Sequence, residues 1–206
     1  MDMPEYTKIN TVWKRTERGQ IIEGEYATPE LAYLAGNEWE WTEKVNGTNI
    51  RVGWDGMAVE FGGRTANAQI PAKLVAVLRG LFEDRGRLTK VFGTDPAILY
   101  GEGYGAGIQN GGLYAPEQAF VLFDVLIDRW WLSRANVNGI AEALGLRAVP
   151  VIGRGTLPET CETVKAGLVS QWGSFPAEGI VARPVVDLFD RKGERIVAKI
   201  KAKDYR

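Results

Sequence analysis

The sequence predicts an α+β protein with largely antiparallel sheets. Short strand-like segments joined by turn residues come first, and strand-like segments that alternate with amphipathic helical segments follow. The chain has 206 residues, of which 45% are hydrophobic and 25% are charged. That length and composition allow a sizeable core. We therefore expect residues 1–206 to form a single domain.

The first third of the chain predicts a short helix and then three strands. Residues 28–36 carry capping and proline residues suited to a helix start, and a glycine suited to its end. Residues 38–45 and 48–54 predict strands, and an Asp-Gly turn leads to a third strand at 58–61. Lys44 is therefore expected at the end of a strand in an antiparallel sheet.

The rest of the chain alternates between helical and strand patterns. Helices are predicted where apolar residues recur at helical spacing, and strands where short apolar runs lie between turn signals. In order, the sequence predicts a helix at 71–84, a strand at 97–103, a glycine-rich loop at 103–118, a strongly apolar strand at 119–127, a helix at 133–146, a strand at 149–153, a helix at 158–172, and strands at 178–184 and 195–201.

Composition excludes several classes of protein. A net charge of −1 argues against coating nucleic acid by bulk charge. The single cysteine, Cys161, excludes a disulfide within the chain. The absence of histidine removes serine–histidine and cysteine–histidine catalysis and histidine-ligated zinc. No signal pattern or membrane-length apolar run occurs, so we expect a cytoplasmic protein without a membrane partner.

Five stretches could carry chemistry. Taken singly, each has an ordinary structural interpretation, such as a solvated lysine, a loop carboxylate or a core phenylalanine. The stretches are EKVNGTN at 43–49, GGRTAN at 62–67, YGEGYG at 100–105, FVLFDV at 120–125, and the closing pair AEGIVARP at 177–184 and VAKIKAK at 197–203.

The last of these stretches predicts a lysine ladder. In a strand, Lys199, Lys201 and Lys203 share one face, while Ile196, Ala198 and Ile200 share the other. Such a face is common on a solvated edge. It is also a suitable floor for a polyphosphate, because alternate lysines lie about 7 Å apart along a strand.

In order and spacing, the five stretches resemble those of the covalent nucleotidyltransferases, which are nucleic-acid ligases and mRNA capping enzymes. The likeness is nearest to the ATP-dependent RNA ligases of the phage double-strand nick-sealing type, and it covers residues 38–203. The resemblance implies an ATP-grasp-like ligase fold, with antiparallel sheets flanked by helices and a nucleotide cleft between them. It also implies a role in RNA repair.

The resemblance implies a catalytic set. Lys44 would become the lysyl-AMP intermediate, with ATP as the AMP donor. Lys199 and Lys201 would bind the α-phosphate. Their positive charges would also favour the deprotonated form of the Lys44 amine, which the attack requires. Glu178 would help bind Mg²⁺ or Mn²⁺.

The resemblance implies a base-binding set as well. The backbone near Glu43 and Val45 would read the adenine edge, and Phe123 would stack on the base. Phe120 would instead point to the opposite face and belong to the core.

The sugar and the phosphates would be held by a third set. Arg64 would hold the ribose and a phosphate, and Glu102 would hydrogen-bond to the ribose. Asn49 would line the same pocket.

Two features depart from the family pattern. Asn46 stands where many relatives have an acidic residue or histidine, so its role is open. The OB or helical domain that follows in many relatives is not expected here.

Local basic spots occur at 12–18, 85–90 and 201–206, and they are expected to be scattered solvated faces. We therefore expect a monomer that binds nucleic acid weakly or uses a separate nucleic-acid-binding partner.

The leading hypothesis is an ATP-dependent RNA ligase that seals a 5′-phosphate to a 3′-hydroxyl. A DNA nick ligase or a stand-alone adenylyltransferase would use the same first step. A GTP-dependent capping activity would show as an adduct with GTP. A catalytically reduced nucleotide-binding or scaffold protein, motivated by Asn46, would form no adduct.

Overall fold

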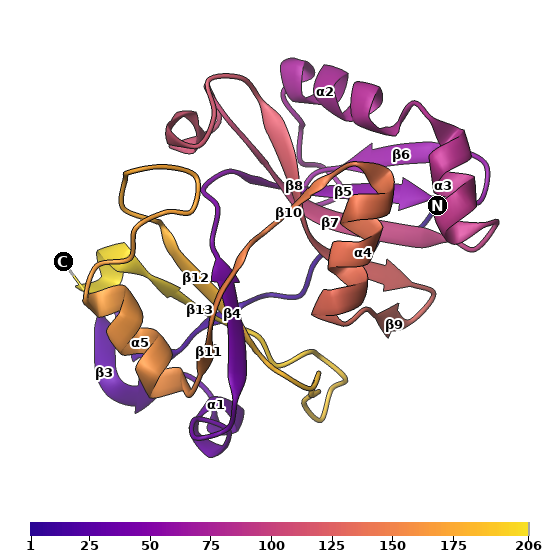
Figure 1. The fold of residues 1–206 in the computed structure, drawn as a ribbon. Helices are drawn as coiled ribbons and strands as arrows, with labels where there is room; N and C mark the ends of the chain where they lie inside the picture. The colour runs from indigo at the N-terminus through magenta and orange to yellow at the C-terminus, as the bar shows by residue number, and fades with distance from the viewer. Residues whose placement is uncertain (206) are drawn as a thin grey trace. The chain divides into compact units, whose positions relative to one another are not determined.

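The computed structural model describes residues 1–205, and its contacts group into two compact units. Unit 1 comprises Met1–Tyr6 and Asn46–Val149, and unit 2 comprises Thr7–Val45 and Pro150–Arg206. Figure 1 labels most of their helices and strands. No helix within residues 1–205 is long and apolar enough to cross a bilayer.

Unit 1 is built on a six-stranded sheet in the order β10-β8-β7-β5-β6, with β9 paired to the end of β8. All neighbours are antiparallel except β10 and β8. The strands are β5 (Thr48–Trp54), β6 (Val59–Gly62), β7 (Ala97–Tyr104), β8 (Ala119–Ile127), β9 (Trp130–Trp131) and β10 (Arg147–Ala148).

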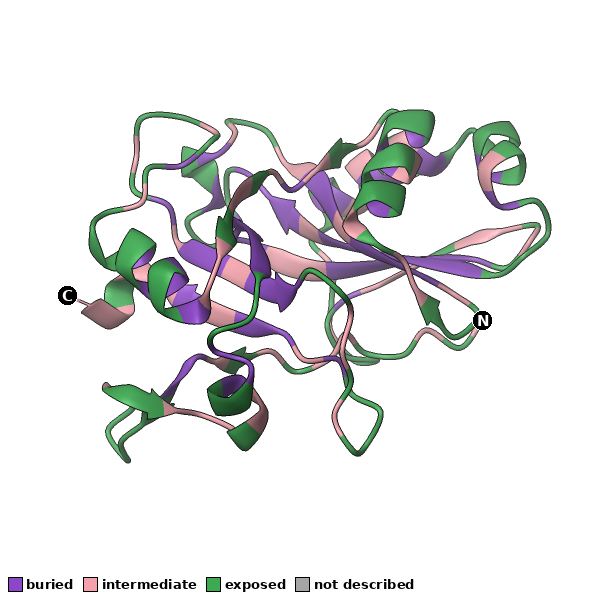
Figure 2. Ribbon diagram, turned by 60° about the horizontal axis from the view of Figure 1, so that its bottom comes forward, coloured by how far each residue is buried: buried purple, intermediate pink, exposed green. Residues whose placement is uncertain are grey.

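Three helices cover one face of this sheet. They are α2 (Ala72–Phe82), α3 (Arg85–Phe92) and α4 (Arg134–Leu144). Their apolar sides join alternate strand residues in one core cluster, because successive strand side chains point to opposite faces. Figure 2 shows buried residues along the strands and exposed residues on the outer turns of the helices.

The N-terminal segment covers part of the opposite face. Its Met1, Met3 and Tyr6 pack against a second cluster that includes Tyr100. The Tyr100 hydroxyl donates to the Pro4 carbonyl at 3.0 Å, and the Arg51 guanidinium donates to the Met3 carbonyl. Burial raises the pKa of Tyr100 to about 12.

Unit 2 is built on a five-stranded sheet in the order β1-β13-β12-β4-β11. The outermost strand β1 runs parallel to β13, and the other pairs are antiparallel. The strands are β1 (Asn10–Thr11), β4 (Trp39–Glu43), β11 (Val151–Gly155), β12 (Gly179–Pro184) and β13 (Ala198–Lys201).

A separate core holds unit 2 together. Trp39, Leu157, Ile180 and Ala198 lie fully buried within it. The unit also contains α1 (Pro29–Tyr33), α5 (Leu157–Lys165), the 3-10 turn η2 (Ala202–Tyr205), and a hairpin of β2 (Trp13–Arg15) and β3 (Ile21–Tyr26).

The structure confirms most predicted elements, shortens one helix and adds elements that were not predicted. The helix predicted at 158–172 ends at Lys165, and the following segment is a loop. The stretch 85–90, taken as a basic spot, lies in α3, which begins after its cap Asp84. The N-terminal strands β1, β2 and β3 were not predicted.

Candidate active site

Lys44 follows directly after β4, as the sequence predicts. Its backbone N–H donates to the Gly179 carbonyl at 2.9 Å and so continues the ladder between β4 and β12. This pairing fixes Lys44 beside the residue that precedes β12, Glu178. Lys44 Nζ lies 2.9 Å from Glu178 Oε2, and its side chain is 22% exposed.

A second lysine binds the other oxygen of the same carboxylate. Lys201 Nζ lies 3.1 Å from Glu178 Oε1. The register pairs Gly179 with Lys201 across β12 and β13, which places Lys201 beside Glu178. The structure therefore brings together two predicted catalytic residues, Lys44 and Lys201, and the predicted metal ligand Glu178 at the ends of three neighbouring strands.

Gly179 makes this close approach possible. A side chain at this position would overlap the carbonyl oxygen of Ile200 on β13, and the backbone has a φ of +153°. Only glycine adopts that geometry without strain. The glycine after Glu178 therefore lets β12 and β13 pair where Lys201 reaches the carboxylate.

Lys199 lies two residues before Lys201, on the same face of β13. Ala198 and Ile200 are buried and Lys199 and Lys201 are half-buried, so the predicted alternation is confirmed over the strand. Lys203, the third predicted member of the ladder, lies instead in η2 because the strand ends at Lys201.

Glu43 is buried, and its side chain is hydrogen-bonded to the loop that follows α5. Its carboxylate accepts a hydrogen bond from Ser170 Oγ at 2.5 Å and another from the Gln171 N–H at 2.7 Å. The Glu43 N–H donates to the Pro150 carbonyl at 3.2 Å. Val45, two residues further along the chain, is buried as well. Ser170 and Gln171 were missed because the sequence placed them in a helix, although Gly167 is a recognisable helix stop.

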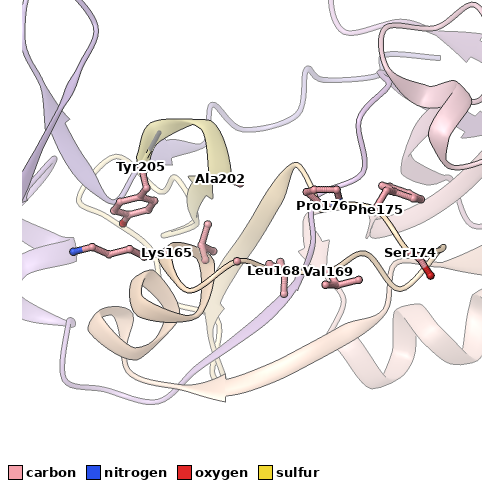
Figure 3. Close-up of a pocket in the computed structure, with 10 residues that line it drawn as sticks. Lys165, Leu168, Val169, Ser174, Phe175, Pro176, Ala202 and Tyr205 are labelled. Carbon is pink, nitrogen blue, oxygen red and sulfur yellow. The ribbon is translucent and has the colours of Figure 1, made fainter.

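That loop walls a cavity of about 350 Å³ in unit 2. Figure 3 shows Leu168 and Val169 on the chain after α5, Phe175 and Pro176 on the returning segment, and Tyr205 from η2. Lys165 Nζ lies 5.9 Å from the centre of the Tyr205 ring. None of the predicted site residues lines this cavity.

In unit 1, Asn49 and Glu102 lie directly opposite each other on β5 and β7. Both residues are half-buried. Asn49 Oδ1 is buried and has no hydrogen-bond partner within residues 1–205. A buried polar atom of this kind is a natural contact for a ligand, because leaving it unpaired is unfavourable.

The turn after Lys44 is held by the glycine-rich loop of unit 1. The Gln109 amide donates to the Gly47 carbonyl at 2.5 Å, and the Asn110 N–H donates to Asn46 Oδ1 at 3.4 Å. Asn46, whose role the sequence left open, thus accepts a hydrogen bond from the loop. Gln109 was not predicted.

Phe123 lies on the opposite face from the helices. It is the unmatched residue of a bulge, because its neighbours Leu122 and Asp124 pair with consecutive residues of β7. Its ring packs edge-on against Tyr6, with centroids 5.0 Å apart. Phe120 belongs to the helix-covered core, which confirms the prediction that it points the other way.

Arg64 and the basic spots are on the surface. Arg64 follows β6 and is exposed. In the three spots, Lys14 pairs with Glu25, Arg15 with Asp204, and Arg87 with Asp84. Arg206, at the end of the third spot, lies outside the described residues.

No group of three acidic, cysteine or histidine side chains within residues 1–205 could hold a metal ion by itself. Glu178 supplies one carboxylate, already between two ammonium groups. Mg²⁺ is commonly held by one or two carboxylates together with substrate phosphates. The donor set therefore fits a metal that binds together with a nucleotide.

Comparisons with known proteins gave one family match and several matches to solved structures. A model of the RNA ligase family matches residues 37–201. Solved structures of Naegleria gruberi RNA ligase are similar to the whole chain: a variant with ATP and Mn has a TM-score of 0.68 and 18% identity over 97% of this chain and 62% of that one. An apo variant has a TM-score of 0.70 and 20% identity over 98% of this chain and 58% of that one. The ligase with pyrophosphate has a TM-score of 0.68 and 18% identity over 100% of this chain and 62% of that one.

These likenesses confirm the predicted α+β nucleotidyltransferase-like fold. The chain spans about three fifths of the length of the structures it matches.

Proposed function

Because this chain belongs to the RNA ligase family, we propose that it is an ATP-dependent RNA ligase that works through a covalent lysyl-AMP at Lys44. One observation carries the proposal: Lys44 and Lys201 bind the two oxygens of a single carboxylate, Glu178. Attack by an amine on a phosphorus atom calls for a nearby cation to stabilise the phosphoryl charge. Lys201 is that cation, and Lys199 on the same face adds a second.

The reaction has three balanced steps. First, the neutral Lys44 amine attacks the α-phosphorus of ATP, the bond from this phosphorus to the oxygen bridging to the β-phosphate breaks, pyrophosphate leaves, and the nitrogen gives up one proton to solvent. Second, a 5′-phosphate oxygen attacks the same phosphorus, the N–P bond breaks, and Lys44 regains a proton. Third, a 3′-hydroxyl attacks the adenylated 5′-phosphate, loses its proton and releases AMP.

Glu178 has two duties in this scheme. It accepts a hydrogen bond from Lys44, so Lys44 must leave this contact before it attacks as a neutral amine. The same carboxylate would help bind Mg²⁺ or Mn²⁺, which when bound neutralises charge on the leaving pyrophosphate. The two duties are compatible because departure of Lys44 frees Oε2.

The nucleotide-binding roles remain part of the proposal. The N–H groups of Glu43 and Lys44 are already paired in the sheet, so the adenine edge would be read by the Glu43 carbonyl and the Val45 backbone. The unpartnered oxygen of Asn49, opposite Glu102, supports their assignment to the ribose side.

Phe123 and Arg64 keep the roles that the family resemblance gives them. The half-buried Phe123 ring would stack on adenine, and the exposed Arg64 would contact ribose and phosphate.

Labelled ATP tests the first step. Wild-type protein incubated with α-labelled ATP and Mg²⁺ or Mn²⁺ should acquire one AMP, removable by pyrophosphate. Lys44→Ala and Lys44→Arg should acquire none, whereas Lys73→Ala, an exposed lysine on α2, should behave as wild type. An adduct on Lys44→Ala would overturn the assignment of the nucleophile, and adduct formation with GTP in place of ATP would indicate capping chemistry.

Comparison of nicked duplexes tests the acceptor. As a ligase of the phage nick-sealing type, the protein should seal a nick whose 3′-hydroxyl strand is RNA faster than an all-DNA nick. Faster sealing of all-DNA nicks would make it a DNA ligase. Adduct formation without sealing of any nick would identify a stand-alone adenylyltransferase.

A further inference from the structure

A cationic groove of about 380 Å³ lies on the β1 edge of the unit 2 sheet. Its lining includes Lys8, Asn10, Arg15, Lys199, Lys201 and Lys203, and we refer to it as the β1 groove. It exists because β1 pairs in parallel with β13, with Thr11 beside Lys199, and because the Val12 N–H donates to the Lys199 carbonyl at 3.2 Å. Residues from opposite ends of the sequence therefore form one groove.

Part of this charge is fixed by carboxylates. Arg15 is bound by Asp204 at 2.7 Å, and Lys201 by Glu178 at 3.1 Å. Lys8 and Lys203 are exposed and make no ion pair within residues 1–205. Two ammonium groups at the rim thus have nothing in the described chain to neutralise them, which favours an anionic ligand.

The lining also indicates which part of a ligand is bound. Besides its cations, the β1 groove offers an amide from Asn10 and one aliphatic side chain, Ile9, while the Thr11 hydroxyl donates to the Trp13 carbonyl at 2.9 Å. Lysine and asparagine side chains are typical phosphate contacts, whereas bases are usually stacked on aromatic rings. The lining therefore matches backbone phosphates.

We propose that the β1 groove binds backbone phosphates of the polynucleotide strand whose 5′-phosphate accepts AMP. The inference rests on the proposed function, because Lys199 and Lys201 belong both to the groove and to the proposed α-phosphate site. One cationic surface therefore extends from the α-phosphate site to the exposed Lys8 and Lys203. A strand held along this surface would present its 5′-phosphate to the adenylate on Lys44.

The β- and γ-phosphates of ATP share this chemistry, so the experiment must separate the two sources. The test variant is the double substitution Lys8→Ala with Lys203→Ala. Its matched control is Lys73→Ala with Lys192→Ala, which removes the same charge from exposed positions outside the groove. Thermal melting checks that both variants fold.

The rate of Lys44 adenylation and the rate of AMP transfer are measured in single-turnover experiments. The test variant should adenylate Lys44 within about twofold of wild type. After pre-adenylation and removal of ATP, its AMP transfer to a 5′-phosphorylated nicked RNA duplex should fall roughly tenfold near physiological salt, because lost phosphate contacts weaken nucleic-acid binding. The control should match wild type in both rates.

Other outcomes overturn the proposal. Slower adenylation with unchanged transfer would assign the groove to the outer phosphates of ATP. Equal rates in test variant, control and wild type would make it an ordinary solvated face.

Binding of 5′-phosphorylated RNA across a salt series tests the groove without catalysis. The slope of log K against log salt should be shallower by about 1–2 in the test variant than in the control. If wild type forms no lysyl-AMP but this difference is present, the proposed function fails and the groove stands. If the slopes are equal, the groove assignment fails whatever the catalytic result.

Discussion

At the scale of single residues, the central feature is one carboxylate between two ammonium groups. Glu178 is 14% exposed and binds Lys44 and Lys201 through different oxygens. Partly desolvated ion pairs of this kind are sensitive to the loss of one partner, because the remaining charges are left uncompensated. Removal of Glu178 would leave two ammonium groups facing each other.

Glu178→Gln should slow adenylation of Lys44 by about 10- to 100-fold and raise the metal concentration needed, the usual effect of losing a metal-site carboxylate. Single-turnover adenylation over a range of Mg²⁺ concentrations measures both effects. Glu142→Gln, on the exposed side of α4, is the matched control. An unchanged rate and metal dependence in Glu178→Gln would remove Glu178 from the site.

Cys161 predicts a pH dependence of stability. Burial raises the pKa of its thiol from 9.0 to about 11. The folded protein therefore holds this proton more tightly than the unfolded chain does. The resulting stability is fully present below about pH 9 and is lost as the pH rises through 11.

The stability advantage of wild type over Cys161→Ala should accordingly shrink between pH 9 and pH 11. Urea unfolding of both proteins at several pH values measures it. A constant difference across this range would show that the thiol does not titrate as its burial implies.

At the scale of elements, local signals identified most helices and strands. Ser133 caps α4 through the Asn136 N–H, and residues 119–127 form β8 with the predicted bounds. Lys44 could be placed at a strand end because alternation and turn residues act over a few positions. The pairing of Lys44 and Lys201 with one carboxylate was not predictable, because it depends on strand register.

The elements that the sequence analysis missed or extended too far differ from it for physical reasons. Helix α5 stops at Lys165, and Gly167 then adopts a φ of +101°. Helix α3 is short and polar, and its only clear signal is the cap Asp84. Strand β1 has two residues, and nothing in its own sequence indicates β13 as its partner. The β1 groove therefore could not be predicted from the sequence.

Two glycine substitutions should have opposite effects. Gly179→Ala should destabilise unit 2 by about 3 kcal/mol or more and abolish adenylation, because the new methyl group would overlap the Ile200 carbonyl and strain the backbone. Gly139→Ala, inside α4 with open space around it, should stabilise the protein by about 0.5–1 kcal/mol. Urea unfolding and the labelled-ATP assay give both results. Normal adenylation in Gly179→Ala would contradict the close approach of β12 and β13.

At the scale of the whole molecule, each unit has its own core. Leu78 of α2 is fully buried in unit 1, and Leu157 of α5 is fully buried in unit 2. The sequence predicted enough apolar residues for a core, but the division of the core between two units follows from which strands pair. That division lets stability be perturbed locally.

Leu78→Ala and Leu157→Ala should each destabilise the protein by about 2–5 kcal/mol. Hydrogen exchange should accelerate in β5, β7 and β8 for the first variant and in β4, β12 and β13 for the second. Each variant serves as the control for the other. Equal acceleration across all six strands in both variants would mean that the two cores open together.

The parallel pairing of β1 with β13 has a consequence for synthesis. During translation, β1 is made long before its partner β13. Pairing of partners so distant in sequence is slow, because the long intervening loop must close first. A nascent chain that has not reached β13 would therefore lack both the groove and Lys201, and nucleotide chemistry at Lys44 should begin only once β13 has emerged from the exit tunnel.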